Sequence, residues 1–467
     1  MSFDWPLVKI DDVAISINTG LDAIRRAPIV EYETNLKCLR IQDISKGKPL
    51  SEWGFTETKD SDYKKYRLVK DDIIMARTCS TGINYLVRED LPAVFNNGLA
   101  RLRFNLEQVH PPFMYYVFQS KDFINYINGI SGGTSVQLNM KVGDLAKYEF
   151  NLPSVKEQIV IAEKLTNIDE KILNNAKINQ TLEQIAQAIF KSWFVDFDPV
   201  KAKIEALAAG GSADDAELAA MGVISAKTLD ELNSLKANNP EAFNKLAQTA
   251  ALFPAAMQDS ELGEIPEGWE VSEIGSEVTV VGGGTPSTKN TEFWEDGTIH
   301  WTTPKDMSGL SSKVLTRTDR KITELGLKKI SSGLLSENTV LMSSRAPVGY
   351  LALAKIPVAI NQGYIAMKCE ARLSPEYVLL WCDHNMEEIK QRASGTTFAE
   401  ISKSNFKPIP VIVPDSSVID AFSAQVSRIY NLVHSNVLQS EILSSARDFL
   451  LPELLSGDFS DFYKDGH

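Results

Sequence analysis

The feature that most constrains this chain is an internal repeat. Residues 161–189 align with residues 422–450 at one constant offset of 261, without a gap. Apolar residues meet apolar residues at the main positions of the pattern, as Ile168 meets Ile429 and Leu182 meets Leu443, and a polar interruption is shared, since Asn175 falls on Asn436. Self-similarity at a fixed period indicates copies of one structural unit. We therefore expect two related halves.

The repeat extends outward from these segments with small changes of offset. "IIMARTCSTG" resembles "VLMSSRAPVG", and "VFNNGLARLR" resembles "AINQGYIAMK". The matched pairs are Trp5 with Trp269, Gly20 with Gly284, Arg77 with Arg345, Asn96 with Asn361, and Gly98 with Gly363. Each copy is thus a globular segment followed by a helix.

Both repeated segments carry an apolar heptad pattern, which is typical of helix-on-helix packing. A helix that only covered its own domain would need about two turns, whereas about 38 residues would span roughly 57 Å. A partner helix is therefore favoured over simple coverage. The expected interface residues are Ile161, Leu165, Ile168, Ile172, Leu182 and Ile189, and Phe422, Val426, Ile429, Val433, Leu443 and Leu450.

The globular segments have mixed α/β patterns. "DDIIMARTCSTGINYLV" and "NTVLMSSRAPVGYLAL" predict strand–turn–strand units, and "PVAINQGYIAMKC" predicts one further strand. Residues 375–394 predict a helix that Ser374 caps, with a counterpart beginning at Pro111. Residues 200–264 are rich in Ala, Gly and Asp and predict a loosely packed helical linker.

The net charge of −13 argues against a strongly basic surface. However, residues 1–150 contain 19 basic and 19 acidic side chains, and residues 265–414 contain 16 and 17. The acidic excess therefore lies in the connecting segment and the tail. If DNA is bound, a partner must supply much of the phosphate neutralisation.

Catalytic motifs are absent. No GxxxxGK[ST] loop occurs, and the glycines at 282–284 lack the context of a cofactor loop. The sequence His110-Pro111-Pro112-Phe113 is a near miss to an amino-methyltransferase motif and indicates a helix start. The four cysteines lack metal-ligand spacing and indicate reduced thiols. No apolar run is long enough for a membrane helix, so we expect a cytoplasmic protein without a metal site.

Recognition residues are the remaining candidates for function. Gly-rich loops let backbone amides and short hydroxyls approach a phosphate or base, although an ordinary helix C-cap is equally compatible. The arginines suit guanine or phosphate, or a structural salt bridge, and the amides suit adenine or a turn. The DNA-binding candidates are Arg77, Asn96, Thr134, Ser135, Gln137, Arg345, Asn361, Gln362, Thr396 and Thr397. Arg101 and Arg103 distinguish the first half from the second, which has Ala366 or Met367 and Lys368.

Several motifs, taken together and in order, resemble the specificity subunit of type I restriction–modification systems. They are "LPSVKEQIVIAEKLTNIDEKI" at 152–172, "AIFKSWFVDFDPVKAK" at 188–203, "DSELGEIPEGWEV" at 259–271, "GGTPS" at 283–287 and "LLPELLSGDF" at 450–459. The resemblance covers essentially the whole chain. One departure is that "VPDSSVIDA" lacks the counterpart of Glu157-Gln158, which predicts a weaker or different partner contact there.

The resemblance implies an α/β fold class with two similar target recognition domains, separated by two long antiparallel coiled-coil-like helices in a pseudo-two-fold tandem repeat. It implies a non-catalytic subunit that reads a bipartite, asymmetric target in double-stranded DNA. It also implies two modification (methyltransferase) subunits and restriction (motor-nuclease) subunits as partners, with S-adenosylmethionine, ATP and Mg on those chains and no cofactor in this one. No membrane partner is implied.

The expected domains follow from the repeat and the resemblance. They are a first recognition domain at 1–153, a helical spacer at 154–199, a linker at 200–264, a second recognition domain at 265–414, and a distal helix and tail at 415–467. Two alternatives stay open: an enzyme with a degenerate active site, and a scaffold of two pseudo-repeats that does not bind DNA. DNA modification or cleavage by the purified chain would favour the first, and a negative gel shift with partner subunits would favour the second.

Overall fold

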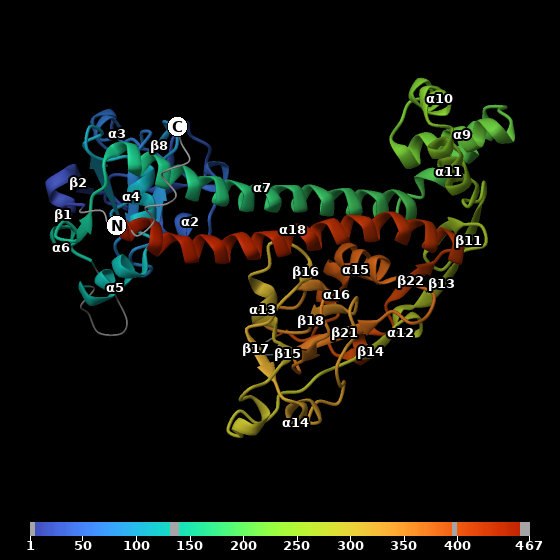
Figure 1. Cartoon of the computed structure of the whole chain (residues 1–467). Coiled ribbons are helices and arrows are strands. Elements are labelled where there is room, and N and C mark those ends of the chain that lie inside the picture. The colour runs from blue at the N-terminus through green and yellow to red at the C-terminus, as the bar shows by residue number, and fades with distance from the viewer. Residues whose placement is uncertain (1–4, 131–139, 395–398, 458–467) are drawn as a thin grey trace. The chain divides into compact units, whose positions relative to one another are not determined.

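The computed structural model of the chain contains two compact units. It describes residues 5–130, 140–394 and 399–457. One unit comprises residues 1–172 and 442–467, and the other comprises residues 173–441. Both boundaries fall inside long helices, α7 (Val155–Phe194) and α18 (Ser416–Ser456), so each unit holds one α/β domain and part of each helix (Figure 1).

The first unit is built on two four-stranded sheets and a short two-stranded ribbon. The strands of the first sheet are, in order, β2 (Ala14–Thr19), β9 (Leu99–Phe104), β6 (Ile73–Ala76) and β7 (Asn84–Leu86). Those of the second sheet are, in order, β3 (Ile29–Val30), β5 (Gly54–Thr56), β4 (Lys37–Leu39) and β8 (Ala93–Phe95). The ribbon pairs β1 (Leu7–Lys9) with β10 (Glu149–Asn151). The helices are α1 (Ile10–Val13), α2 (Ile41–Ser45), α3 (Asp60–Tyr66), α4 (Pro111–Val117), α5 (Lys121–Ile130) and α6 (Val142–Leu145).

The second unit repeats this plan with a five-stranded sheet, a three-stranded sheet and a ribbon. The strands of the five-stranded sheet are, in order, β14 (Thr279–Val281), β21 (Tyr364–Lys368), β18 (Val340–Ser343), β19 (Leu351–Ala354) and β16 (Val314–Leu315). Those of the three-stranded sheet are, in order, β17 (Arg320–Ile322), β15 (Ile299–Thr302) and β20 (Ala359–Ile360). The ribbon pairs β13 (Glu270–Glu273) with β22 (Pro410–Val413). The helices are α12 (Ile274–Glu277), α13 (Pro304–Ser308), α14 (Glu324–Leu327), α15 (Pro375–His384), α16 (Met386–Gln391) and α17 (Lys403–Phe406).

The two predicted strand–turn–strand units are confirmed. Strand β6 pairs with β7 and strand β18 pairs with β19, both antiparallel. The matching order of elements in the two units confirms the tandem repeat of a mixed α/β domain followed by a long helix. The hairpins form because their apolar strands are buried on both faces and glycines at positive φ permit the turns, as at Gly82 and Gly349.

Two predicted elements are each divided by a side-chain cap. The predicted strand "PVAINQGYIAMKC" is split between two sheets, because Asn361 folds the backbone into a turn between β20 and β21. Ser374 caps α15 by accepting a hydrogen bond from the Tyr377 amide, as predicted. This helix ends at His384, and the Asn385 side chain donates to the Trp381 carbonyl. Its predicted counterpart divides into α4 and α5 in the same way.

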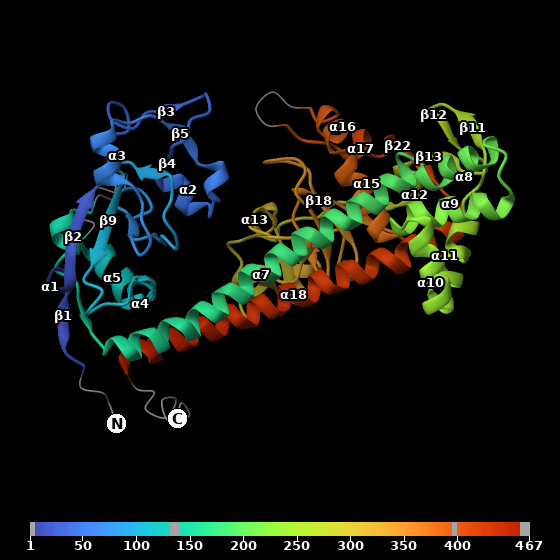
Figure 2. The ribbon, with the colours of Figure 1, turned by 90° about the horizontal axis from the view of Figure 1, so that it is seen from above.

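The two long helices pack against each other in antiparallel orientation within each unit (Figure 2). In the second unit, Asn175 of α7 bonds to Ser440 of α18, whereas further along α7 Phe190 packs against Phe422, at 6.2 Å between ring centroids. In the first unit, Arg447 donates to Asp169 at 2.8 Å. This agrees with the predicted fold class of α/β domains joined by long antiparallel helices.

The apolar seam consists of fully buried and half-buried positions. Five of the twelve predicted interface residues are fully buried, and the other seven are half-buried. The buried ones are Ile161, Leu165, Phe422, Val426 and Val433. The half-buried ones are Ile168, Ile172, Leu182, Ile189, Ile429, Leu443 and Leu450. The seam therefore forms one continuous stripe on each helix.

A layer of polar side chains interrupts the seam in the second unit. Asn175 and Asn179 are 0% and 2% exposed. Asn436 donates to the Asn179 side-chain oxygen at 2.9 Å, and Asn175 donates to Gln439 at 2.9 Å. A buried amide needs such partners, because an unsatisfied one costs about 1–3 kcal/mol. Only one alignment of the two helices satisfies them, so the layer fixes helix register.

Residues 200–264 pack more closely than the loose linker that we expected. They form α8 (Asp198–Ala208), α9 (Ala213–Ser225), α10 (Leu229–Asn238), α11 (Pro240–Ala251) and a hairpin of β11 (Met257–Ser260) with β12 (Gly263–Pro266). Capping boxes at Ser212 and Thr228 begin α9 and α10. Met221 and Leu232 share a small buried core, so the segment is a folded subdomain of the second unit.

The polar layer generates a stability prediction. Asn436→Ala removes the donor to Asn179 and leaves a buried amide oxygen without its partner, so the free energy of unfolding should fall by about 1–3 kcal/mol. Urea unfolding followed by circular dichroism measures the change. The exposed Gln180→Ala on the partner helix α7 is the control, and an equal loss in both variants would contradict a register-fixing layer.

Candidate nucleic-acid interface

The candidates that the structure describes lie around one turn in each unit, which follows β8 in the first unit and β20 in the second. The Asn96 side-chain oxygen accepts from the Gly98 amide at 3.2 Å, and the Asn361 oxygen accepts from the Gly363 amide at 2.8 Å. These are Asx turns, in which the side chain replaces a backbone partner. The structure thus supports the turn role for both asparagines over direct reading of adenine.

The residue after each asparagine lies exposed at the tip of the turn. Gln362 is exposed and its side-chain oxygen accepts from the Thr285 hydroxyl at 2.6 Å. Asn97 is its exposed counterpart in the first unit. Sequence reasoning selected Gln362 and missed Asn97 and Thr285, although the alignment of "VFNNG" with "AINQG" already paired Asn97 with Gln362.

A glycine holds the neighbouring loop against each turn. A Cβ built on Gly20 would lie 2.2 Å from the Asn96 carbonyl oxygen, and one on Gly283 would lie 1.9 Å from the Ile360 carbonyl oxygen. No other residue fits such an approach. Gly283 is therefore the structural counterpart of Gly20, which corrects the pairing with Gly284 by one residue.

Arg77 serves the backbone of its own unit. Its guanidinium donates to the Met140 carbonyl at 3.2 Å and to the Asn97 carbonyl at 3.4 Å, and its amide donates to the Gly98 carbonyl at 2.9 Å. The side chain is half-buried. Arg77 and Asn96 are thus brought together at the turn, where this arginine has a structural role.

Arg345 has a looser environment. Its guanidinium lies 3.7 Å from the Glu400 carboxylate, and the two side chains are 37% and 46% exposed. The preceding Ser344 amide donates to the Gly363 carbonyl at 2.8 Å, so Arg345 adjoins the same turn as Asn361 and Gln362. An exposed ion pair is worth little and exchanges easily for another anion.

Sequence reasoning also missed Lys403. Its ammonium lies beside the glycine loop, 3.4 Å from a Cβ built on Gly282, and the side chain is exposed. A lysine at the first position of a four-residue helix carries no motif, and only the folded chain places it near Gly282. It adds positive charge to the same face of the second unit.

The remaining candidates lie outside the described residues. They are Thr134, Ser135, Gln137, Thr396 and Thr397. Their described flanks adjoin the two arginines, since the Met140 amide donates to the Arg77 carbonyl at 2.8 Å and Ser394 forms a backbone bridge with Glu400.

Arg101 is buried and Arg103 is half-buried, and both bind partners within their own unit. Arg101 is 3% exposed and donates to the Arg67 and Lys65 carbonyls. Arg103 donates to Asp72 at 2.5 Å, and Asp72 also lies 3.8 Å from Arg101. Burial lowers the pKa of Arg101. Both arginines hold the sheet to the preceding loop, and the burial of Arg101 contradicts the expectation that this residue helps to distinguish the two recognition surfaces.

The Glu157-Gln158 pair is also used within the first unit. Gln158 is fully buried, accepts from the His110 amide at 2.8 Å and donates to two carbonyls, those of Gln108 and Pro153. Glu157 accepts from the Ser154 amide and caps α7. Because the Glu157-Gln158 pair contacts its own unit, the lack of such a pair at the start of α18 gives no ground for expecting a weaker contact with a partner subunit there.

Metal-ligating clusters and membrane-spanning helices are two features that the described part of the chain lacks. No group of three or more His, Cys, Asp or Glu side chains there could hold a metal ion. No helix among the described residues is long and apolar enough to cross a membrane.

Comparison with known proteins gives a consistent result. The family model for the type I restriction modification DNA specificity domain matches residues 4–184 and 266–425. The HindI specificity subunit of Haemophilus influenzae is 34% identical over 365 residues, which cover 76% of this chain and 78% of that protein. The putative MjaX specificity subunit of Methanocaldococcus jannaschii is 22% identical over 466 residues, which cover 97% of this chain and 93% of that protein.

One solved structure has a similar fold. The crystal structure of the type I S subunit from M. genitalium aligns with a TM-score of 0.52 at 15% identity, and the alignment covers 97% of this chain and 96% of that one.

The different environments of the two arginines predict different effects on stability. Arg77→Ala leaves the part-buried Met140 carbonyl without its side-chain donor and should lower the free energy of unfolding by about 1–2 kcal/mol. Arg345→Ala removes an exposed ion pair and should cost well under about 1 kcal/mol. Thermal and urea unfolding of both variants measure this, and equal losses would refute the distinction.

Proposed function

The chain belongs to the family of type I restriction–modification specificity subunits, and on that premise we propose that each of its two target recognition domains reads one half of a bipartite, asymmetric DNA sequence. Family membership makes it the recognition and assembly subunit of its complex and not the catalytic one. The reading residues adjoin the turns after β8 and β20.

The observation that supports this proposal is that the turns of the two units have the same backbone geometry but expose different side chains. Both turns have the same Asx geometry and the same close glycine. At the exposed tip, one unit has Asn97 and the other has Gln362. The Arg77 guanidinium donates hydrogen bonds to backbone carbonyls, whereas the Arg345 guanidinium forms an exposed ion pair with Glu400. Since base readout depends on where donors and acceptors stand, the two domains should read different bases.

In the second unit, the proposed reading group consists of Arg345, Gln362 and Lys403. The Arg345 guanidinium matches the two acceptors of guanine, and the Gln362 amide matches adenine. Lys403 is suited to a phosphate, which positions the domain without specifying sequence. The first unit offers Asn97 in the place of Gln362.

The assembly is proposed from the family. Two modification subunits and restriction subunits would bind this chain and carry S-adenosylmethionine, ATP and Mg. The net charge of −13 supports a division of work, because this chain alone is poorly suited to neutralise many phosphates. Addition of the modification subunits should therefore raise DNA affinity and steepen its salt dependence.

Methylome sequencing tests the reading group. Arg345→Ala should relax discrimination by about 1–3 kcal/mol at one position, and only in the half read by the second domain. The exposed Arg428→Ala on α18 removes the same charge and serves as the control. An unchanged motif at unchanged occupancy, or relaxation in the other half, would remove Arg345 from the readout.

The DNA motif recognised with the wild-type chain tests whether the two domains read different bases. We expect an interrupted sequence whose halves are not inverted copies of each other, because the two tips differ. Methylome sequencing of a host with and without this chain identifies the motif. A palindromic motif would contradict the assignment of different readout to the two domains.

A further inference from the structure

An arginine of the second unit lies against two tryptophan rings. Strand β17 pairs with β15 in an antiparallel register that places Arg320 directly opposite Trp301, and residues opposite each other share one face of a sheet. The Arg320 Cζ atom lies 3.6 Å from the ring centroid of Trp294 and 5.6 Å from that of Trp301. The two rings meet edge to face, at 5.0 Å between centroids. Together they form a platform for one guanidinium group.

The stacking orients the guanidinium but uses none of its hydrogen-bond donors. The Arg320 side chain is exposed, and no residue that the structure describes accepts a hydrogen bond from its guanidinium or forms an ion pair with it. A guanidinium carries five N–H donors in its own plane, whereas an aromatic ring contacts only its face. An exposed arginine usually loses rotamer freedom when it binds a ligand. Arg320 is already ordered, with its donors still available.

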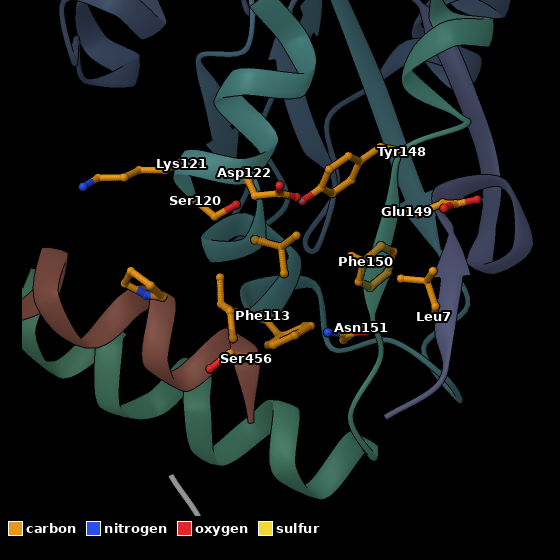
Figure 3. A pocket seen from close by; sticks show the side chains of 13 residues that line it. Leu7, Phe113, Ser120, Lys121, Asp122, Tyr148, Glu149, Phe150, Asn151 and Ser456 are labelled. Carbon is orange, nitrogen blue, oxygen red and sulfur yellow. Dashed lines mark hydrogen bonds between the residues drawn. The ribbon is translucent and has the colours of Figure 1, made fainter. Parts of the chain in front are cut away.

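Charged groups in the first unit show the more usual arrangement, in which the partner is part of the chain. Arg26 lies over an aromatic ring at 5.2 Å, but it also donates to the Asp62 carboxylate. Arg101 lies over another ring at 5.3 Å, but it donates to two backbone carbonyls. Asp122 lines an apolar groove near the end of α18, where its carboxylate accepts from the Tyr148 hydroxyl at 2.8 Å (Figure 3). The stacked arginine of β17 therefore differs in having donors without acceptors.

The tryptophan platform is attached to the loop that carries part of the proposed reading group. Both indole nitrogens donate to this loop, one to the Gly284 carbonyl at 3.1 Å and the other to the Ser287 carbonyl at 3.0 Å. Between these two points, the Thr285 hydroxyl donates to Gln362 at the exposed tip of the turn. The loop thus joins the platform to the turn that presents Gln362.

We propose that Arg320 reads a guanine in the half-site of the second domain, and that Trp294 positions it. The inference rests on the function proposed above and adds one residue to the reading group. Two parallel N–H groups of a guanidinium match the O6 and N7 acceptors of guanine in the major groove. Adenine presents an amino donor in place of O6, so the same fork discriminates against it.

The rigid stack favours a base over a phosphate as the ligand. A phosphate contact positions the protein and requires mainly charge, which a flexible lysine supplies. Lys321, Lys328 and Lys329 are exposed in the same part of the chain and suit that role. A fixed guanidinium plane is useful where the donors must lie in the plane of a base edge. The structure therefore assigns the base contact to Arg320 and leaves phosphates to the lysines.

Methylome sequencing, together with competition binding of the chain assembled with its modification subunits, tests the assignment. Arg320→Ala should lower the preference for guanine about tenfold or more at one position of the second half-site. Arg320→Lys should have a similar effect, because lysine keeps the charge but lacks the planar fork. Lys321→Ala is the matched control, since successive strand residues point to opposite faces, and it should leave the motif unchanged.

The contrary outcomes are distinct. A uniform loss of affinity for all sequences, with recovery in Arg320→Lys, would make Arg320 a phosphate contact and overturn the proposal. An unchanged motif at unchanged occupancy, or relaxation in the half read by the first domain, would overturn it as well. If Arg345→Ala relaxes one position while Arg320→Ala relaxes none, only this inference fails. If the wild-type chain directs no bipartite motif, the proposed function itself fails.

The positioning role of Trp294 has a separate test. Trp294→Leu removes the aromatic platform and should weaken the guanine preference at the same position as Arg320→Ala, by a smaller factor. Trp294→Phe retains an aromatic ring and should restore most of the preference. A purely structural role would instead lower binding to all sequences equally. That result, or a failure of phenylalanine to restore discrimination, would contradict the positioning role.

Discussion

Apolar packing along α7 and α18 is the interaction on which both α/β domains depend. In the first unit, Leu451 and Leu454 of α18 belong to the same buried cluster as Phe113. In the second unit, Ala186 and Phe190 of α7 belong to the core that contains Tyr377. Each domain is therefore completed by a helix segment that lies far away in the sequence, as Leu451 lies from Phe113 and Phe190 from Tyr377. Folding of each domain must be coupled to pairing of the helices, because neither core is closed by local sequence.

The buried asparagines show how such a pairing is kept specific. A seam of aliphatic side chains alone tolerates sliding by a heptad, since one apolar residue replaces another at little cost. Asn175 and Asn179 give up some apolar burial, but they find partners in only one alignment. The chain thus combines a strong, unspecific attraction with a weaker, directional one.

The sequence predicted what is periodic and local. The repeat, the long helices, the hairpins and the Ser374 cap could all be predicted because heptads, alternation and capping residues leave a pattern in neighbouring residues. The outcome was different for Arg101 and Gln158, whose partners Asp72 and His110 are far away in the chain. Lys403 was missed for the same reason. Charge and polarity predict that a residue needs a partner, but only the fold determines whether that partner is protein or a ligand.

The close contact between glycine and turn separates what can change in this protein from what cannot. Gly20 and Gly283 have no room for a side chain, and Asn96 and Asn361 are tied to the backbone beside them. The next residue along, Asn97 or Gln362, is exposed and supports little of the frame. A substitution there costs little in folding and alters the chemical groups displayed at the tip. The backbone of the turn is therefore fixed, whereas the residue at its tip can be exchanged. A new DNA sequence preference can arise in one domain while the other domain keeps its own.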